Sequence, residues 1–115
     1  MTQEQFATLE IRTDTPPLRQ DKSGAVRIGE TQVLLELVIR AFQDGATPET
    51  IVQRYPSTSL ADIYAVIAYY LRNRGLVERY LAERERQAEA LQQRIEAHQG
   101  DLSEVRRRLL AQRIP

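Results

Sequence analysis

Apolar residues recur at helical spacing in the segment that follows Gly29, and they predict a buried amphipathic helix. Six of these residues share one helix face, and Gly45 stands where such a helix would stop. The six positions are Val33, Leu34, Leu37, Val38, Ala41 and Phe42.

A short second helix is predicted to follow Gly45. Thr47 is a good N-cap, and Pro48 suits the first helical position because its missing N–H has no partner there in any case. We expect this helix to run to about Arg54, because the residue before Pro56 is disfavoured from helical geometry.

Ser59 and Asp62 have the spacing of a capping box and predict the start of a third helix. Its apolar side consists of Leu60, Ile63, Val66, Ile67, Tyr70 and Leu71. A four-residue turn separates the second and third helices, so the pair has the layout of a helix-turn-helix.

Little periodicity is found in residues 1–16, which we expect to form a flexible N-terminus. Three apolar residues there could add a short strand or pack over a neighbouring element: Phe6, Leu9 and Ile11. Two short extended runs follow, Leu18–Gln20 and Ala25–Ile28, joined by a polar turn in which Gly24 can take a positive φ. These runs predict a small β-hairpin.

The C-terminal third contains an apolar seam that advances by alternating steps of four and three residues, which is typical of a seven-residue repeat. Its positions are Val77, Leu81, Arg84, Ala88, Leu91, Ile95, His98, Leu102, Val105 and Leu109. We expect a long helix with a weak point at Gly75. Gly100, followed by Asp101 and Glu104, predicts a stop and a new cap, leaving a last helix over 102–112. A seam this narrow needs the globular part, a second copy or a foreign partner to cover it.

The predicted fold is mainly α, with a small N-terminal β-hairpin, a helix-turn-helix or winged-helix-like three-helix core and a long C-terminal helix. We expect three parts: the flexible residues 1–16, the hairpin and helix-turn-helix-like domain over 17–75, and an extended helical region over 76–115 that serves dimer or partner binding.

The amino-acid composition excludes several classes of functional site. The chain has 115 residues, no cysteine and one histidine, so a disulfide framework, a thiolate zinc site, a cysteine nucleophile and a histidine metal cluster are excluded. Known catalytic motifs are missing too, and we expect no enzyme activity, no metal and no cofactor. No apolar run is long enough to cross a bilayer, and the start lacks the layout of a signal peptide, so a cytoplasmic protein is the expectation.

The helix pair offers candidate DNA contacts, because hydroxyl groups and free N–H groups at a helix start bind phosphates. The candidates are Ser57, Thr58, Ser59, Tyr64, Arg72 and Asn73. Two features oppose this interpretation: Asp62 lies on the same opening turn, and no Lys or Arg lies between Arg54 and Arg72 to neutralise phosphates. Packing or dimerisation by this helix stays open as the alternative.

The C-terminal region offers candidate partner contacts. They are Val77, Leu81, Leu91, Ile95, Arg106, Arg107 and Arg108. The three arginines have three possible roles: a solvated helix end that complements the helix dipole, a phosphate-binding patch, or guanidinium groups that enter an acidic pocket of a partner. The apolar seam is suited to lie in a groove of that partner.

From Leu18 to about Tyr80 the chain resembles the prokaryotic family called domain of unknown function 433, which is grouped with VapB-type antitoxins. The resemblance is carried by Gly29 and Thr31 before the first helix, and by the stretches TPETIV, Tyr55-Pro56 and SLADIYAVIAYYL. Two positions depart from the family pattern: the loop is DKSGAV in place of Gly-Gly-x-Pro, and Gln32 replaces an arginine.

The resemblance implies a homodimeric helix-turn-helix-like protein, encoded beside a PIN-like ribonuclease toxin that it binds and inhibits, and able to repress its own operon by binding operator DNA. In that role one of the three clustered arginines would enter the acidic metal-binding site of the nuclease. Two alternatives are a stand-alone DNA-binding transcriptional regulator and a structural helical dimerisation module.

Overall fold

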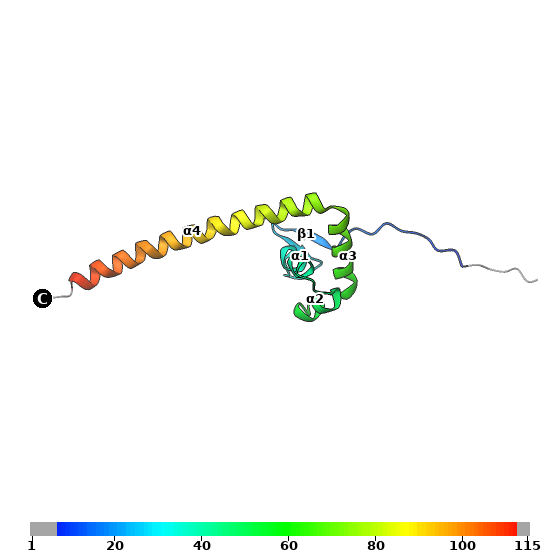
Figure 1. Ribbon diagram of the computed structural model, residues 1–115, viewed down its shortest axis with the longest axis horizontal. Coiled ribbons are helices and arrows are strands. Elements are labelled where there is room, and N and C mark those ends of the chain that lie inside the picture. Colours follow the sequence, from blue (N-terminus) through cyan, green and yellow to red (C-terminus); the bar gives the residue numbers. More distant parts are fainter. Residues whose placement is uncertain (1–6, 113–115) are drawn as a thin grey trace, which may run out of the picture. The chain divides into compact units, whose positions relative to one another are not determined.

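The computed structural model describes residues 7–112, and these residues form two units, one that ends at Tyr69 and one that begins at Tyr70. The elements of the described part are β1 (Leu18–Gln20), β2 (Val26–Ile28), α1 (Leu35–Gln43), α2 (Pro48–Arg54), α3 (Leu60–Arg72) and α4 (Arg74–Gln112) (Figure 1). The boundary between the units falls within α3. The expected fold class is confirmed: the protein is mainly α, with an N-terminal hairpin and a long C-terminal helix.

The residues that precede the hairpin form no helix or strand from position 7 to position 16. Leu9 and Ile11 are exposed and therefore do not supply the short strand that their apolar character allowed. Phe6, the third apolar residue of that segment, lies outside the described residues.

β1 and β2 pair antiparallel, with Leu18 opposite Ile28, as the two extended runs predict. The Asp21 carboxylate closes the turn, because its Oδ1 accepts hydrogen bonds from the Ser23 hydroxyl at 2.6 Å and from the Ser23 backbone N–H at 2.9 Å. These bonds, led by that of the Ser23 side chain, lower the pKa of Asp21 from 3.8 to about 2. The charged carboxylate thus stabilises the turn above the ordinary pKa, and this contribution is lost as the pH falls toward 2.

The first helix begins two residues later than its apolar pattern predicts. The Val33 carbonyl accepts a hydrogen bond from the Ile28 N–H at 2.9 Å, and Leu34 forms an isolated antiparallel bridge with Arg27. The assignment of Val33 and Leu34 to the helix is therefore wrong, because the backbone of both residues pairs with the hairpin before α1 starts at Leu35.

The buried face of α1 is also rotated relative to the expectation. Leu37, expected in the core, exposes 40% of its surface, whereas its neighbour Glu36 exposes only 8%. Ile39, which the six-residue pattern omitted, is fully buried. Gly45 ends the helix as predicted, with a φ of 96° and its N–H donating to the Phe42 carbonyl.

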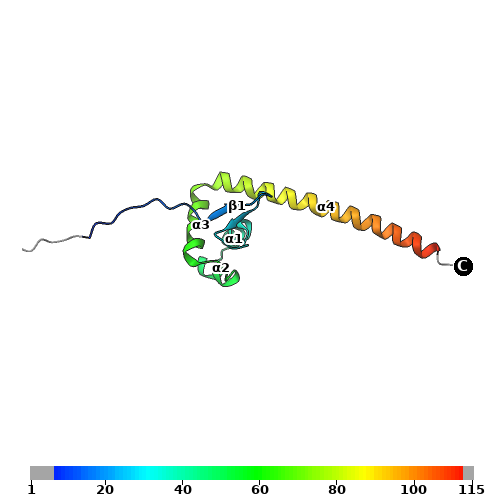
Figure 2. The same ribbon diagram turned by 180° about the vertical axis from the view of Figure 1, so that it is seen from behind.

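Both predicted caps around the helix pair are present. The Thr47 hydroxyl oxygen accepts a hydrogen bond from the Thr50 N–H, and the Ser59 hydroxyl oxygen accepts one from the Asp62 N–H, each at 3.1 Å. The three short helices and the hairpin enclose the core of the first unit (Figure 2). The apolar residues buried there are Ala25, Ile28, Leu35, Val38, Ile39, Ala41, Ile51, Ile63, Val66 and Ile67.

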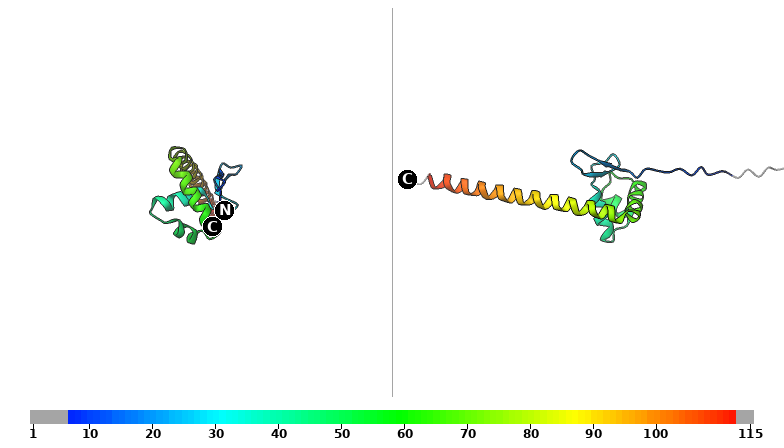
Figure 3. Two further views of the ribbon diagram at one scale, coloured as in Figure 1. Left: turned by 90° about the vertical axis from the view of Figure 1, so that its right-hand side faces the viewer. Right: turned by 90° about the horizontal axis from the view of Figure 1, so that it is seen from above.

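The second unit is dominated by α4, which is one uninterrupted helix, seen lengthwise in the right-hand view of Figure 3. The expected stop at Gly100 is wrong, and so is the weak point at Gly75, because both glycines lie inside α4 with helical backbone. The break falls at Asn73, whose carbonyl accepts the hydrogen bond of the Val77 N–H and so opens the new helix. A single interior glycine costs about 1 kcal/mol relative to alanine, which the many good helix formers around it outweigh.

Candidate functional site

The turn between α2 and α3 uses two of the candidate DNA contacts for its own structure. Thr58 is buried, and its hydroxyl donates a hydrogen bond to the Tyr55 carbonyl oxygen at 2.7 Å. The Ser59 hydroxyl caps α3, as described above, whereas Ser57 is exposed. The hydroxyl groups of Thr58 and Ser59 therefore stabilise the turn and the start of α3. Of the three candidates, only Ser57 is exposed and has no such structural role.

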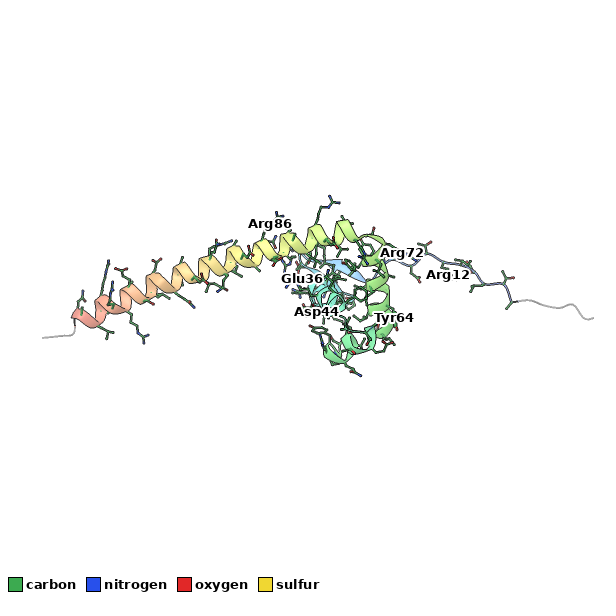
Figure 4. The ribbon with its side chains drawn as sticks, in the orientation of Figure 1. Arg12, Glu36, Asp44, Tyr64, Arg72 and Arg86 are labelled. Carbon is green, nitrogen blue, oxygen red and sulfur yellow. The ribbon has the colours of Figure 1, made fainter. Side chains whose placement is uncertain are left out.

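Tyr64 on the outer face of α3 is joined to α2 by a short hydrogen bond. Its hydroxyl donates to Glu49 Oε1 at 2.6 Å, and Figure 4 shows the ring projecting from α3. This bond raises the pKa of Tyr64 above 10.0 and lowers the pKa of Glu49 below 4.5. The sequence gives no signal for this pair, because the two residues are 15 positions apart and lie on different helices.

We expect the Glu49→Gln variant to bring the pKa of Tyr64 back toward 10, because the variant removes the negative charge that disfavours the tyrosinate. The measurement is a pH titration of the Tyr64 ring signals by NMR. In the wild-type protein the hydrogen bond contributes stability below the ordinary tyrosine pKa, and this contribution is lost as the pH rises through the raised value. Glu30→Gln, an exposed carboxylate of the same unit, is the matched control. A Tyr64 titration that is the same in both variants would contradict the assignment.

The remaining candidate DNA contacts lie in the second unit. Arg72 is the exposed last residue of α3, and Asn73 separates α3 from α4. The Glu49 carboxylate beside Tyr64 adds negative charge to the α2–α3 surface, where phosphate binding would need cations. Operator binding through this surface stays a prediction.

The candidate partner contacts on α4 differ in accessibility. Val77 is only 3% exposed and Leu81 is half-buried, so the seam is covered where α4 begins. Further along, its large apolar side chains are 44–56% exposed. We call the exposed part of the seam the α4 stripe, and it consists of Ala88, Leu91, Ile95, His98, Leu102, Val105 and Leu109. The stripe is the largest regular series of exposed apolar side chains among the described residues.

Three exposed arginines flank the end of the α4 stripe. The Glu104 carboxylate lies 3.5 Å from the Arg107 guanidinium and 3.3 Å from that of Arg108. Exposed pairs of this kind contribute at most about 1 kcal/mol, so these guanidinium groups can leave Glu104 for a stronger anionic partner at little cost. Arg106 is exposed on the same turn.

Residues 7–112 contain neither a candidate metal site nor a candidate membrane span. No group of three or more histidine, aspartate and glutamate side chains is arranged to hold a metal ion in this range. Nor does any helix there have the length and apolarity that a membrane span requires.

The fold and these surfaces define a small helical domain with a hairpin, followed by a long amphipathic helix. Residues 21–70 match the family described as "Protein of unknown function (DUF433)", which supports the family resemblance over that segment of the chain. The match ends before α4 begins, so the α4 stripe and the arginines lie outside it. Neither the curated proteins nor the solved structures contain a match to the chain.

Proposed function

We propose that the chain is a non-enzymatic, homodimeric adaptor of the antitoxin type, which binds and inhibits a PIN-like ribonuclease. The observation that carries the proposal is α4 itself, a helix of 39 residues that bears an exposed apolar stripe and ends in three arginines. Such a helix is suited to bind other polypeptides, because exposed apolar side chains at regular spacing are covered only when a second surface packs on them.

The arginines supply the inhibitory contact in this proposal. A PIN-like ribonuclease holds its catalytic metal with carboxylates, and a guanidinium group binds carboxylates through two parallel hydrogen bonds. An arginine from the end of α4 would therefore compete with the metal for these ligands. The toxin class itself comes from the family resemblance, which the match over residues 21–70 supports only as a family of unknown function.

The test combines the full-length chain with the PIN-like ribonuclease encoded beside its gene and measures complex formation and RNA cleavage. Replacing Arg106, Arg107 and Arg108 by glutamine should raise the concentration needed for half-inhibition by about tenfold or more, because charge-assisted contacts are lost. The matched control replaces Arg74, Arg79 and Arg86, three exposed arginines of α4 that precede the α4 stripe, by glutamine. Equal inhibition by the two triple variants would overturn the role of the arginines, and a wild-type chain that does not bind the nuclease would overturn the proposed function.

A further inference from the structure

The α4 stripe has the composition of a helix–helix seam. In the seven-residue repeat, its a positions are Ala88, Ile95, Leu102 and Leu109, and its d positions are Leu91, His98 and Val105. All of these side chains are exposed, whereas the earlier seam residue Val77 is buried. Along the seam, the uncovered surface therefore runs from Ala88 to Leu109, and this limits the registers that a partner helix can adopt.

The two edges of the stripe carry an ordered distribution of charge. The edge at the e positions consists of Glu85, Gln92, Gln99 and Arg106, and the edge at the g positions consists of Gln87, Arg94, Asp101 and Arg108. The first edge thus runs from an acidic to a basic end, and the second has opposite charges at its two central positions. Each edge is complementary to its own reversed copy.

We propose that two copies of the chain pair antiparallel along the α4 stripe, with Leu91 of one copy opposite Leu102 of the other. In antiparallel coiled coils each edge faces the same edge of the partner in reverse order. This register brings Glu85 next to Arg106 of the partner copy, and Arg94 next to Asp101 of the partner copy. The twofold axis repeats both contacts, so four opposite-charge pairs flank the seam.

The layers within the seam favour the same arrangement. Antiparallel pairing puts the small Ala88 opposite Val105 and places Ile95 opposite His98. The polar His98 side chain therefore does not face its own copy within the seam. A parallel pair in register would instead stack His98 on its own copy and Arg84 on its own copy, and would retain a single kind of opposite-charge contact, Asp101 with Arg106. Charge and layer composition therefore both select the antiparallel orientation.

This pairing specifies the homodimeric state that the proposed function includes, and it requires no nuclease. Arg107 lies at an outer position of the repeat, away from the seam, and so remains uncovered in the pair. Arg106 borders the seam in this pair, so of the three clustered arginines only Arg107 is clear of the dimer contact. Because the dimer forms without a nuclease, its dissociation constant reports the pairing alone, and a failure of nuclease inhibition leaves the pairing standing.

Charge exchange in the full-length chain tests the orientation. We expect Arg94→Asp to raise the dimer dissociation constant about tenfold, because two attractive pairs become repulsive. Asp101→Arg should raise it by a similar factor for the same reason. The double variant should return to within about twofold of the wild-type constant, because the opposite charges are restored with exchanged signs. Sedimentation equilibrium at low salt measures all four proteins, and Arg107→Asp, the same charge change on the outer face, should leave the constant unaltered.

Three outcomes would overturn the proposal. The first is a wild-type chain that stays monomeric at every concentration, which would assign the stripe to a foreign partner. The second is a dimer whose constant is insensitive to Arg94→Asp. The third is an Asp101→Arg defect that Arg94→Asp does not rescue, because a parallel pair places Asp101 against Arg106 and keeps that repulsion in the double variant.

Discussion

Replacing Ile51 by alanine is expected to lower the free energy of unfolding of the first unit by about 2–5 kcal/mol. Ile51 is fully buried and is the one buried residue of α2. A helix of seven residues is not stable alone in water, so α2 depends on this side chain to stay attached to the core. Because a unit this small has a modest total stability, a loss of that size would unfold a large fraction of the molecules.

Ile11→Ala is the matched control, because it removes the same atoms from a side chain that is 87% exposed. Urea unfolding should be followed by the NMR amide signals of α2 and α3, since α4 dominates the far-ultraviolet circular dichroism. The control should unfold at the wild-type urea concentration. If Ile51→Ala also unfolds there, α2 does not depend on Ile51 for its attachment.

The parts of the fold that the sequence predicts well are those set by local signals. The caps at Thr47 and Ser59 act on N–H groups three residues away, and the turn glycines Gly24 and Gly45 take the positive φ that their positions require. The hairpin followed from extended runs on either side of a polar turn. Each of these features depends on residues a few positions apart, so a pattern in the sequence contains most of the information.

The parts that the sequence misplaces are set by packing between distant segments. Val33 and Leu34 have good helical spacing, but their backbone pairs with the hairpin, and this changes which face of α1 is buried. Gly100 is misplaced for a local reason: it looks like a helix stop, but the good helix formers around it keep the backbone helical. A local pattern predicts the secondary structure that a segment can form. It does not predict which distant segments will form hydrogen bonds with the backbone of that segment.

In the candidate sites, too, the sequence predicts the features that depend on local spacing and misses those that depend on packing. The repeat on α4 identifies the exposed α4 stripe, because the spacing of seven residues holds along the whole helix. The repeat alone cannot separate the buried Val77 from the exposed Leu91, since both lie at equivalent positions. The hydrogen bond between Glu49 and Tyr64 likewise depends on how α2 and α3 pack and has no counterpart in the spacing.

The second large effect is expected at Gly29, where the hairpin joins the segment that leads to α1. Its φ is 51°, its N–H donates to the Pro17 carbonyl at 2.7 Å, and its carbonyl accepts from the Arg19 Nε at 2.8 Å. The left-handed backbone is therefore fixed by contacts on both sides. A Cβ added there would lie 3.0 Å from Asp62 Oδ2, which is tighter than ordinary van der Waals contact.

We expect Gly29→Ala to lower the free energy of unfolding of the first unit by about 1–3 kcal/mol, because a residue with a Cβ is strained at positive φ. Gly24→Ala is the matched control for the backbone cost alone, since its φ is 89° and an added Cβ there meets nothing within 4 Å. The difference between the two variants, measured by urea unfolding, reports the contact with Asp62. Adding Asp62→Ala to Gly29→Ala should remove that difference, and it leaves the Ser59 cap intact because the cap uses the backbone N–H of residue 62. If Gly29→Ala lowers the free energy of unfolding no more than Gly24→Ala does, the close approach of Asp62 adds nothing to the cost, and the strain at residue 29 comes from its φ alone.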